Sequence, residues 1–295
     1  MLDFVILTED RYESPQNVDW YVQNVLQEDK LLLDALCNLG FSAKRISWSS
    51  KKFDWSKTKF AIFRTTWDYF ERYGEFLKWI KSTSLKTKFI NPYNQVIWNL
   101  DKSYLGYFKK RGVNIVPSFF VDKKTSLESI LNLKKWEDVV IKPVISAAAW
   151  NTHRIKKKSV KNKEELFMSL QNSQKMVVQE FQKNILSQGE ISMIVIGGKV
   201  THSVLKRAKD GDYRVQDDYG GTVGLYKPSA DEVRFSELVV SMCSPIPVYA
   251  RVDIIRDNKN KLALSELELI EPELWFRFNP DSANLLAKQI EKKYF

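Results

Sequence analysis

Acidic residues alternate with apolar ones on two adjacent stretches near the carboxyl end of this 295-residue chain. The alternation predicts two strands joined by a turn at Asp257 to Lys261, because successive side chains of a strand point to opposite faces. In such a hairpin Asp253 lies opposite Glu266, and Glu268 shares their face. Carboxylates crowded on one face repel one another and need a compensating cation. A Mg²⁺ ion takes oxygen ligands of this kind and leaves the rest of its shell to water and phosphate.

Two neighbouring residues could belong to the same patch. Arg251 precedes Asp253 by two positions and therefore shares its face, and Glu271 is a third candidate acid after Glu268. The alternative is a solvated strand face on a basic protein, on which Glu266 and Glu268 pair with nearby lysines. The hairpin pattern alone leaves both interpretations open.

A lysine at the end of an apolar strand is a second candidate. Lys142 follows the strand that begins at Asp138, so its aliphatic stem can be packed while its ammonium group faces an anion. The loop from Ser146 to Trp150 is built largely of small residues whose backbone N–H groups could approach a phosphate, although it has no glycine. Taken alone, a lysine in this position is more often a surface side chain.

A third candidate is the apolar strand that begins at Met176 and ends at Gln179 and Glu180, with Glu190 shortly after it. An extended strand that exposes backbone donors and acceptors can bind the edge of a purine, and an acid further on can bind ribose hydroxyls. An ordinary edge strand is the alternative interpretation.

Three residues after the predicted strand Phe60 to Phe63 could hold a small ligand: Arg64, Trp67 and Asp68. Open parallel sheets bind ligands at the carboxyl ends of their strands. An arginine there can hold a carboxylate and an aspartate can hold an ammonium group, which suits an amino-acid-like substrate. A capped loop with aromatic packing is the alternative. Arg214 is a further candidate for contact with the acyl substrate.

The elements that must position these residues alternate between strand and helix over the first 90 or so residues. Such alternation predicts an α/β fold with a parallel sheet covered by helices. The chain is then expected to divide into an N-terminal α/β domain, a small α+β unit and a strand-rich C-terminal unit that carries the hairpin: residues 1–92, 93–181 and 182–295. Within the second unit we expect a helix from about Asp101 to Arg111 and a strand before Pro117.

Composition limits the class of protein. The chain has 44% hydrophobic residues, enough for a sizeable core, and 46 Lys and Arg against 36 Asp and Glu, a net charge of +10. Neither an export signal nor a membrane-spanning run is evident, which favours a cytoplasmic protein without a membrane partner. Cys37 and Cys243 lie in apolar contexts and are expected to be buried thiols. The positive charge suits either a nucleic acid or a phosphate-bearing substrate.

The order of these candidates resembles the ATP-grasp superfamily, and within it the glutathione-synthetase-like and cycloserine-biosynthesis ligase branch. The resemblance rests on RTTWDYF, VLKRAKDGDYRVQ and ELELIEP, and on RVD thirteen residues before an E-x-acid pair, and it extends from Leu2 to about Pro280. It implies an ATP-grasp fold behind an N-terminal pre-ATP-grasp domain. Two features depart from the family: Glu268 stands where an asparagine is usual, and the phosphate loop lacks glycine.

The resemblance also implies roles for single residues, taken in the order of the ligands they would contact. The ATP phosphates would be contacted by Lys102, Lys142 and the loop at Ser146. Adenine would be bound by backbone groups of Gln179, Glu180 and Phe181, and ribose by Glu190. The transferring phosphate would be neutralised by Lys206 or Arg207 together with Arg251, with Arg214 near the acyl substrate. Mg²⁺, or Mn²⁺ in its place, would be held by Asp253, Glu266 and Glu268.

The implied activity is that of an ATP-dependent carboxylate–amine ligase. A small carboxylate substrate would be phosphorylated by ATP, and an amine would then attack the acyl phosphate. Two alternatives remain: a nucleotide-binding relative without catalysis, and a nucleic-acid-binding protein that uses the basic run Lys156 to Lys163. Such runs are usually solvated faces, so a nucleic-acid partner is the weaker interpretation. The sequence allows a homo-oligomer and does not name the acid or the amine.

Overall fold

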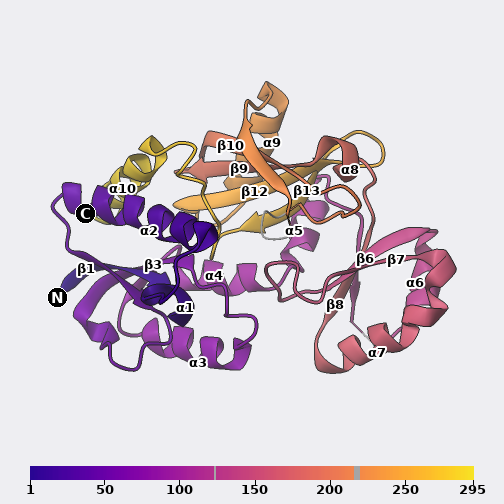
Figure 1. Ribbon diagram of the computed structural model, residues 1–295, viewed down its shortest axis with the longest axis horizontal. Helices are drawn as coiled ribbons and strands as arrows, with labels where there is room; N and C mark the ends of the chain where they lie inside the picture. Colours follow the sequence, from indigo (N-terminus) through magenta and orange to yellow (C-terminus); the bar gives the residue numbers. More distant parts are fainter. Residues whose placement is uncertain (123, 216–219) are drawn as a thin grey trace.

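The computed structural model describes residues 1–122, 124–215 and 220–295. Its strands form three sheets, with the first at the lower left of Figure 1, the second at the lower right and the third above and between them. The expected mixed α/β fold with a parallel N-terminal sheet is confirmed. In the part of the chain that the structure describes, none of the helices has the length and apolarity required to cross a bilayer.

The first sheet is parallel and has the strand order β2-β1-β3-β4. Its strands are β1 (Leu2–Thr8), β2 (Ala43–Ser47), β3 (Thr58–Thr65) and β4 (Lys88–Ile90). The helices of this part are α1 (Asp10–Glu13), α2 (Trp20–Asn38) and α3 (Tyr73–Thr83), with a 3-10 turn at Trp55–Lys57. The side chain of Asp19 caps α2 by accepting from the Val22 amide, and Gly40 ends the helix with a φ of +86°.

The second sheet is antiparallel and has the order β5-β8-β6-β7. Its strands are β5 (Ser118–Val121), β6 (Asp138–Pro143), β7 (His153–Lys156) and β8 (Met176–Glu180). Helices α6 (Leu127–Lys134) and α7 (Glu164–Ser173) pack against it, and their buried side chains share one core with alternate strand residues. Short 3-10 turns at Lys157–Ser159 and Lys161–Lys163 precede α7.

The third sheet is also antiparallel, with the order β11-β10-β9-β12-β13. Its strands are β9 (Glu190–Ile196), β10 (Lys199–Arg207), β11 (Thr222–Tyr226), β12 (Tyr249–Arg256) and β13 (Leu262–Glu268). Its helices are α8 (Ile185–Gln188), α9 (Ala230–Ser241) and α10 (Asp281–Tyr294). Helix α10 returns to the N-terminal part and packs beside α2, as Figure 1 shows. The strands of each sheet fall within the three expected units, so we propose to keep the divisions at 92 and 181.

The helix expected from about Asp101 to Arg111 is confirmed as α5 (Tyr104–Lys110). A further helix that was not predicted, α4 (Tyr93–Leu100), precedes it, and Asp101 separates the two because its backbone is extended and its carboxylate accepts from the Ser103 amide. Two expectations about local structure were wrong. The strand expected before Pro117 follows it as β5. Cys37 is exposed, whereas Cys243 is buried as expected. Strands β7 and β11 and helix α6 were not predicted.

Candidate active site

A cavity of about 270 Å³ lies where the three sheets approach one another. Residues from all three parts line it, including Trp67 after β3, Lys142 at the end of β6, and the charged faces of β10, β12 and β13. The predicted residues on its wall are Lys102, Lys142, Ser146, Gln179, Glu180, Phe181, Glu190, Lys206, Arg214, Arg251, Asp253, Glu266, Glu268, Glu271 and Trp67. Segments far apart in the sequence therefore meet around one cavity.

The hairpin pairs the residues that were predicted to face one another, although its register shifts between Asp253 and Ile254. Asp253 pairs with Glu266 and Arg251 pairs with Glu268 across β12 and β13. The carboxylate of Asp253 is 2% exposed and accepts from the Ser192 hydroxyl at 2.5 Å and from the Arg251 Nε at 3.0 Å. The acidic face of the hairpin is therefore turned into the cavity and not into bulk solvent.

Protein cations balance these acids. Lys102 Nζ lies 3.1 Å from Glu266 Oε1, and the Arg251 guanidinium bridges Asp253 at 2.9 Å and Glu268. Lys206 Nζ lies 2.5 Å from Glu190 and 3.5 Å from Asp253. Within the described residues no group of three acids, histidines or cysteines is close enough to form a metal-binding cluster as it stands. Side-chain cations thus neutralise part of the acidic patch.

The pKa values of the acids differ because their partners differ. Burial would raise the pKa of Asp253, but Arg251 and Lys206 outweigh it and lower this pKa to about 2. Burial raises the pKa of Glu268 well above its usual value, although Arg251 opposes the shift. Burial likewise raises the pKa of Glu271 to about 7, against a hydrogen bond from Tyr69. The cations around Asp253 therefore favour its anionic form, whereas burial favours the protonated forms of Glu268 and Glu271.

The lysines that we expected to face phosphates lie together. Burial lowers the pKa of Lys142, with Glu266 opposing the shift, and Lys102 donates from Nζ to the Ser146 carbonyl as well as to Glu266. Ala148 and Ala149, in the loop after Ser146, have φ values of 48° and 53°. These are left-handed conformations that glycine adopts most easily.

The expected adenine site needs a correction. Strand β8 lies inside its sheet and is paired on both sides, so Gln179 does not belong to an edge strand, and the Phe181 amide donates to the Asp138 carbonyl at 2.8 Å. The Glu180 carbonyl accepts from Gln182 Nε2 at 2.9 Å, and the backbone N–H of Gln182 has no hydrogen-bond partner among the described residues. Gln182 also lines the cavity. From the sequence we named its neighbour Phe181 and missed Gln182.

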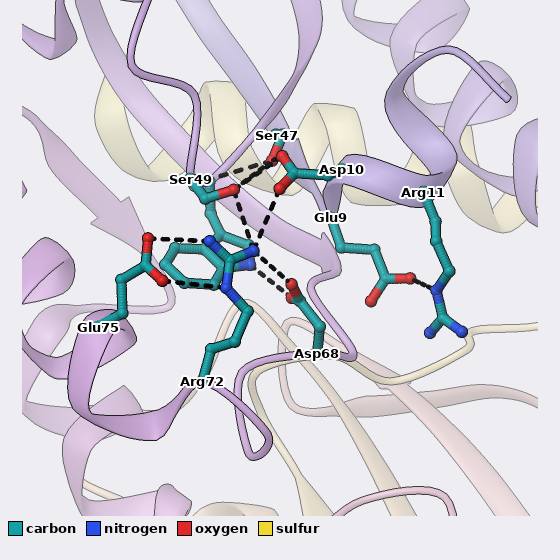
Figure 2. Close-up of polar contacts among 9 residues, drawn as sticks. Glu9, Asp10, Arg11, Ser47, Ser49, Asp68, Arg72 and Glu75 are labelled. Atoms are coloured by element: carbon teal, nitrogen blue, oxygen red, sulfur yellow. Dashed lines mark hydrogen bonds and ion pairs between the residues drawn. The ribbon is translucent and has the colours of Figure 1, made fainter.

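Two of the expected substrate residues do not reach the cavity. Arg64 is 1% exposed and its Nη2 lies 2.7 Å from Glu28, because it points to helix α2. Asp68 accepts from Arg72 at 2.9 Å, within the network at the end of the parallel sheet that Figure 2 shows. Trp67, in contrast, lines the cavity and donates from Nε1 to the Glu271 carbonyl at 2.9 Å. The Asp68 contacts favour the alternative of a capped loop.

The basic strand β10 resolves one alternative. Lys206 is buried on the cavity side, and Arg207, the next residue, is exposed on the opposite face because side chains alternate along a strand. Arg214 lines the cavity and pairs with Asp212 at 2.7 Å. Gln216, the last residue of the VLKRAKDGDYRVQ motif, lies outside the described residues.

Comparisons with known proteins support the predicted relationship. Residues 4–91 match the family described as the N-terminal domain of D-cycloserine synthetase DcsG, and residues 114–269 match the RimK-like ATP-grasp domain. The cycloserine biosynthesis protein DcsG of Streptomyces lavendulae is 25% identical over 280 residues, which cover 89% of this chain and 92% of that protein. A probable alpha-L-glutamate ligase of Marinomonas sp. (strain MWYL1) is 30% identical over 141 residues, 44% of this chain and 42% of that protein.

Solved structures agree with these matches at the level of the fold. The crystal structure of D-cycloserine synthetase DcsG superposes with a TM-score of 0.85, at 24% identity, over 98% of this chain and 99% of that one. The ATP-grasp ligase PsnB, solved with minimal precursor, Mg and ADP, has a TM-score of 0.63 at 12% identity, over 99% of this chain and all (100%) of that one. Ligases of this kind bind ATP and Mg²⁺ and form carbon–nitrogen bonds. Because the RimK-like match covers more than half of the sequence, the chain belongs to the family of ligases with a RimK-like ATP-grasp domain.

Proposed function

We propose that the chain is an ATP-dependent carboxylate–amine ligase that forms an amide or peptide-like bond on a small amino-acid-like substrate. The observation that carries the proposal is the common cavity. The acidic hairpin, the phosphate-facing lysines and the basic residues of β10 and β12 all line it. A catalytic role for one of these groups alone would leave the others unexplained.

The nucleotide would occupy the side of the cavity next to the second sheet. Lys102 and Lys142 would contact its phosphates, with the backbone of the loop from Ser146 as a further anion site. Glu190 would bind ribose, and the Glu180 carbonyl with the Gln182 amide would bind the adenine edge. We assign the adenine edge to this pair and not to the backbone of Gln179 and Phe181, because Gln179 is paired on both sides within the sheet and the Phe181 amide donates to Asp138.

The hairpin has the chemistry that a magnesium site requires. Mg²⁺ is commonly held by one or two carboxylates together with substrate phosphates and water, and Asp253 and Glu266 lie directly opposite one another on the cavity wall. Glu268 would be a third ligand, released from Arg251. Glu271 remains an alternative, although it is engaged with Tyr69. When bound, the ion would neutralise the charge of the transferring phosphate.

The reaction needs no nucleophilic side chain. A carboxylate oxygen of the substrate would attack the γ-phosphorus, and the bond from that phosphorus to ADP would break. Arg251 and Lys206 would stabilise the negative charge on the equatorial oxygens, since both are buried cations next to the acids. The amine nitrogen would then attack the acyl carbon, inorganic phosphate would leave, and the nitrogen would lose a proton to phosphate or solvent.

The substrate class rests on the names of the relatives. One is a cycloserine biosynthesis protein and the other a probable alpha-L-glutamate ligase, and both names suit an amino-acid-like substrate. Glu271 and Trp67 line the end of this cavity nearest the N-terminal sheet, where the carboxylate substrate would lie.

Release of ADP tests the proposal. Purified protein is incubated with ATP, Mg²⁺ and a panel of amino acids, alone and in pairs with small amines, and ADP and phosphate are measured together with the mass of any new product. We expect one class of amino-acid-like acid to stimulate ADP release and to form a product of the mass of an amide. Nucleotide binding without stimulation by any pair would instead identify a nucleotide-binding relative without ligase activity.

A further inference from the structure

Trp275 lies beneath the two cations of the site, at a position that the sequence did not mark. The Arg251 guanidinium lies 5.0 Å from the centre of the indole ring, and Lys206 Nζ lies 5.6 Å from it. The ring lines the cavity and is 3% exposed. Cation–π attraction is strongest where the cation has lost its water, as it has at this buried site. The Lys206 ammonium group and the Arg251 guanidinium therefore both lie against the indole ring at the cavity wall.

The backbone of Trp275 is unusual for a large side chain. Its φ is 48°, in the left-handed region that a bulky residue rarely adopts without support from its surroundings. Glu28 of helix α2 supplies that support. Its Oε1 accepts from the Leu274 amide at 2.5 Å, and its Oε2 accepts from the Phe276 amide at 3.0 Å. One carboxylate thus holds the residues on both sides of Trp275.

Arg64 explains how a buried carboxylate can perform this task. Its Nη2 lies 2.7 Å from Glu28 Oε1, so the buried negative charge has a buried positive partner. The guanidinium also lies 5.6 Å from the Phe276 ring. From the other side, His202 Nε2 donates to the Leu274 carbonyl at 2.9 Å, which fixes the same turn to strand β10.

One nitrogen of the Arg251 guanidinium, Nη1, is available to a ligand. Its Nε and Nη2 donate to Asp253 and Glu268, while Nη1 makes no hydrogen bond to any residue that the structure describes. The Trp275 ring lies against the planar guanidinium and is called the platform below. Because the guanidinium is planar, this platform and the acids beside it together set the direction in which Nη1 points. Movement of Trp275 would therefore redirect Nη1 without removing a charge.

We propose that Trp275 is the positioning residue that aims Arg251 and Lys206 at the transferring phosphate, and that Glu28, through the Leu274–Phe276 turn, is the residue by which the N-terminal part of the chain holds that platform. The inference rests on the proposed ligase function. It gives Arg64 a structural role in place of the expected contact with substrate. It also makes completion of the active site depend on a contact between residues 246 positions apart.

Two substitutions of the platform test the first half of the proposal. We expect Trp275→Leu to lower kcat about tenfold or more while the KM for ATP changes less than threefold, because the cations lose their support but the nucleotide keeps its lysines. Trp275→Phe keeps an aromatic face and should retain at least a third of kcat. Trp79→Leu, which removes an indole that does not line the cavity, is the matched control and should leave kcat unchanged.

A trapping experiment measures the effect of Trp275→Leu on the two cations without turnover. Fluorescent ADP is bound with Mg²⁺, with and without aluminium fluoride, which mimics the phosphoryl group in transit. The fluoride should tighten binding in the native protein, and Trp275→Leu should lose most of that tightening while binding of ADP alone stays within threefold. A merely structural role would weaken both kinds of binding or neither.

A double-variant cycle tests the role of Glu28. Glu28→Gln leaves only one acceptor oxygen for two amides and should lower kcat severalfold, whereas Glu75→Gln, an exposed acid on α3, should not. If Glu28 acts through Trp275, the double variant Glu28→Gln, Trp275→Leu loses no more kcat than Trp275→Leu alone. Should Trp275→Leu fail to fold, the cycle is run with Trp275→Met, which likewise lacks an aromatic face.

The outcomes separate the two proposals. No ADP release by the native protein with any acid and amine would overturn the ligase function, whatever the variants do, and the trapping experiment would still test the platform. Native turnover that Trp275→Leu leaves within twofold would overturn the platform. Multiplying effects in the cycle would overturn the role of Glu28 alone.

Discussion

Asp253 is the residue on which most of the site's charge converges, since it accepts from Ser192 and Arg251 and lies 3.5 Å from Lys206. We expect Asp253→Asn to lower ATP turnover about 10²- to 10³-fold, because an amide oxygen binds a divalent cation and organises the two cations less well. The fold should persist, since Lys206 keeps Glu190 and Arg251 keeps Glu268. Steady-state ADP release measures the loss of turnover, and thermal unfolding of the same samples shows whether the fold persists.

The control for this variant is Glu237→Gln, which removes a carboxylate paired with Lys199 at 2.8 Å outside the cavity. Turnover should be unchanged in the control. If Asp253→Asn unfolds the protein, or turns over ATP at the native rate, the acidic hairpin has a structural role only.

His202 predicts a dependence of stability on pH. Burial lowers its pKa below 6.5, although hydrogen bonds to the Leu274 and Trp275 backbone oppose the shift. The unfolded chain therefore binds a proton more readily than the folded one as the pH falls through 6.5, so the contribution of neutral His202 to stability is complete above that pH and is lost below it. The free energy of unfolding should fall more steeply from pH 7.5 to 5 in the native protein than in His202→Gln.

Urea unfolding at four or five pH values measures this difference. The glutamine amide can still donate to the Leu274 carbonyl but does not titrate, so the two proteins should differ in slope and not only in stability. Parallel slopes would show that His202 carries no proton-linked stability.

At the residue scale, strand alternation and a turn centred near Lys259 and Asn260 predicted that Asp253 faces Glu266, and the two residues do pair. The pairs nearest the turn would place Asp253 opposite Ser265, and a shift of register between Asp253 and Ile254, which the sequence did not predict, restores the pair. Lys206 could not be separated from Arg207 until the orientation of β10 relative to the cavity was known. Arg64 was misassigned because its place at the carboxyl end of a strand fixes the position of its backbone and does not show which residue its side chain pairs with. Its partner Glu28 precedes it by 36 residues.

The loop after β6 offers a prediction at the scale of an element. Ala148 and Ala149 have positive φ values, and a residue with a Cβ loses about 1 kcal/mol in this region relative to glycine. Ala148→Gly and Ala149→Gly should therefore raise the free energy of unfolding, or leave it unchanged, despite the greater freedom of glycine in the unfolded chain. Ala147→Gly, at a position without a positive φ, should lower it by about 0.5–1 kcal/mol.

Chemical denaturation of the three single variants measures these differences. An equal loss of stability in all three would mean that the loop does not hold the left-handed conformation. The sequence showed only that glycine was missing from this loop. The backbone angles, and the contact of Trp150 with Phe70 in the N-terminal part at 5.4 Å, required the structure.

Elements were predictable where the hydrophobic period was long and bounded, as in α2 between Asp19 and Gly40. They were not predictable where pairing is what makes the element. Strand β11 has only five residues and includes Gly224, and its register is set by β10. The division between α4 and α5 likewise depends on one aspartate side chain that competes with the helix for a backbone amide.

At the scale of the whole molecule, the first and third parts share one hydrophobic core. Leu32 and Leu36 of α2, Ile194 of β9 and Leu286 of α10 belong to the same buried cluster. The sequence predicted each amphipathic face but not its partner, because periodicity says that a face is buried and not which element covers it. The unit before residue 92 and the unit after residue 181 therefore do not have independent cores.

Helix α10 allows a test of this shared core. Leu286 is fully buried against α2, whereas its neighbour Leu285 is 38% exposed. Leu286→Ala should lower the free energy of unfolding by about 2–5 kcal/mol, and Leu285→Ala should lower it by less than about 1 kcal/mol.

Because the core joins the N-terminal sheet to the third sheet, loss of Leu286 should shift the unfolding of both together. Urea titrations followed by tryptophan fluorescence, which is dominated by the N-terminal part, and by far-ultraviolet circular dichroism should therefore shift to the same lower midpoint. Midpoints that separate, or a Leu286→Ala protein as stable as Leu285→Ala, would mean that α10 is an appendage and that the two parts fold on their own.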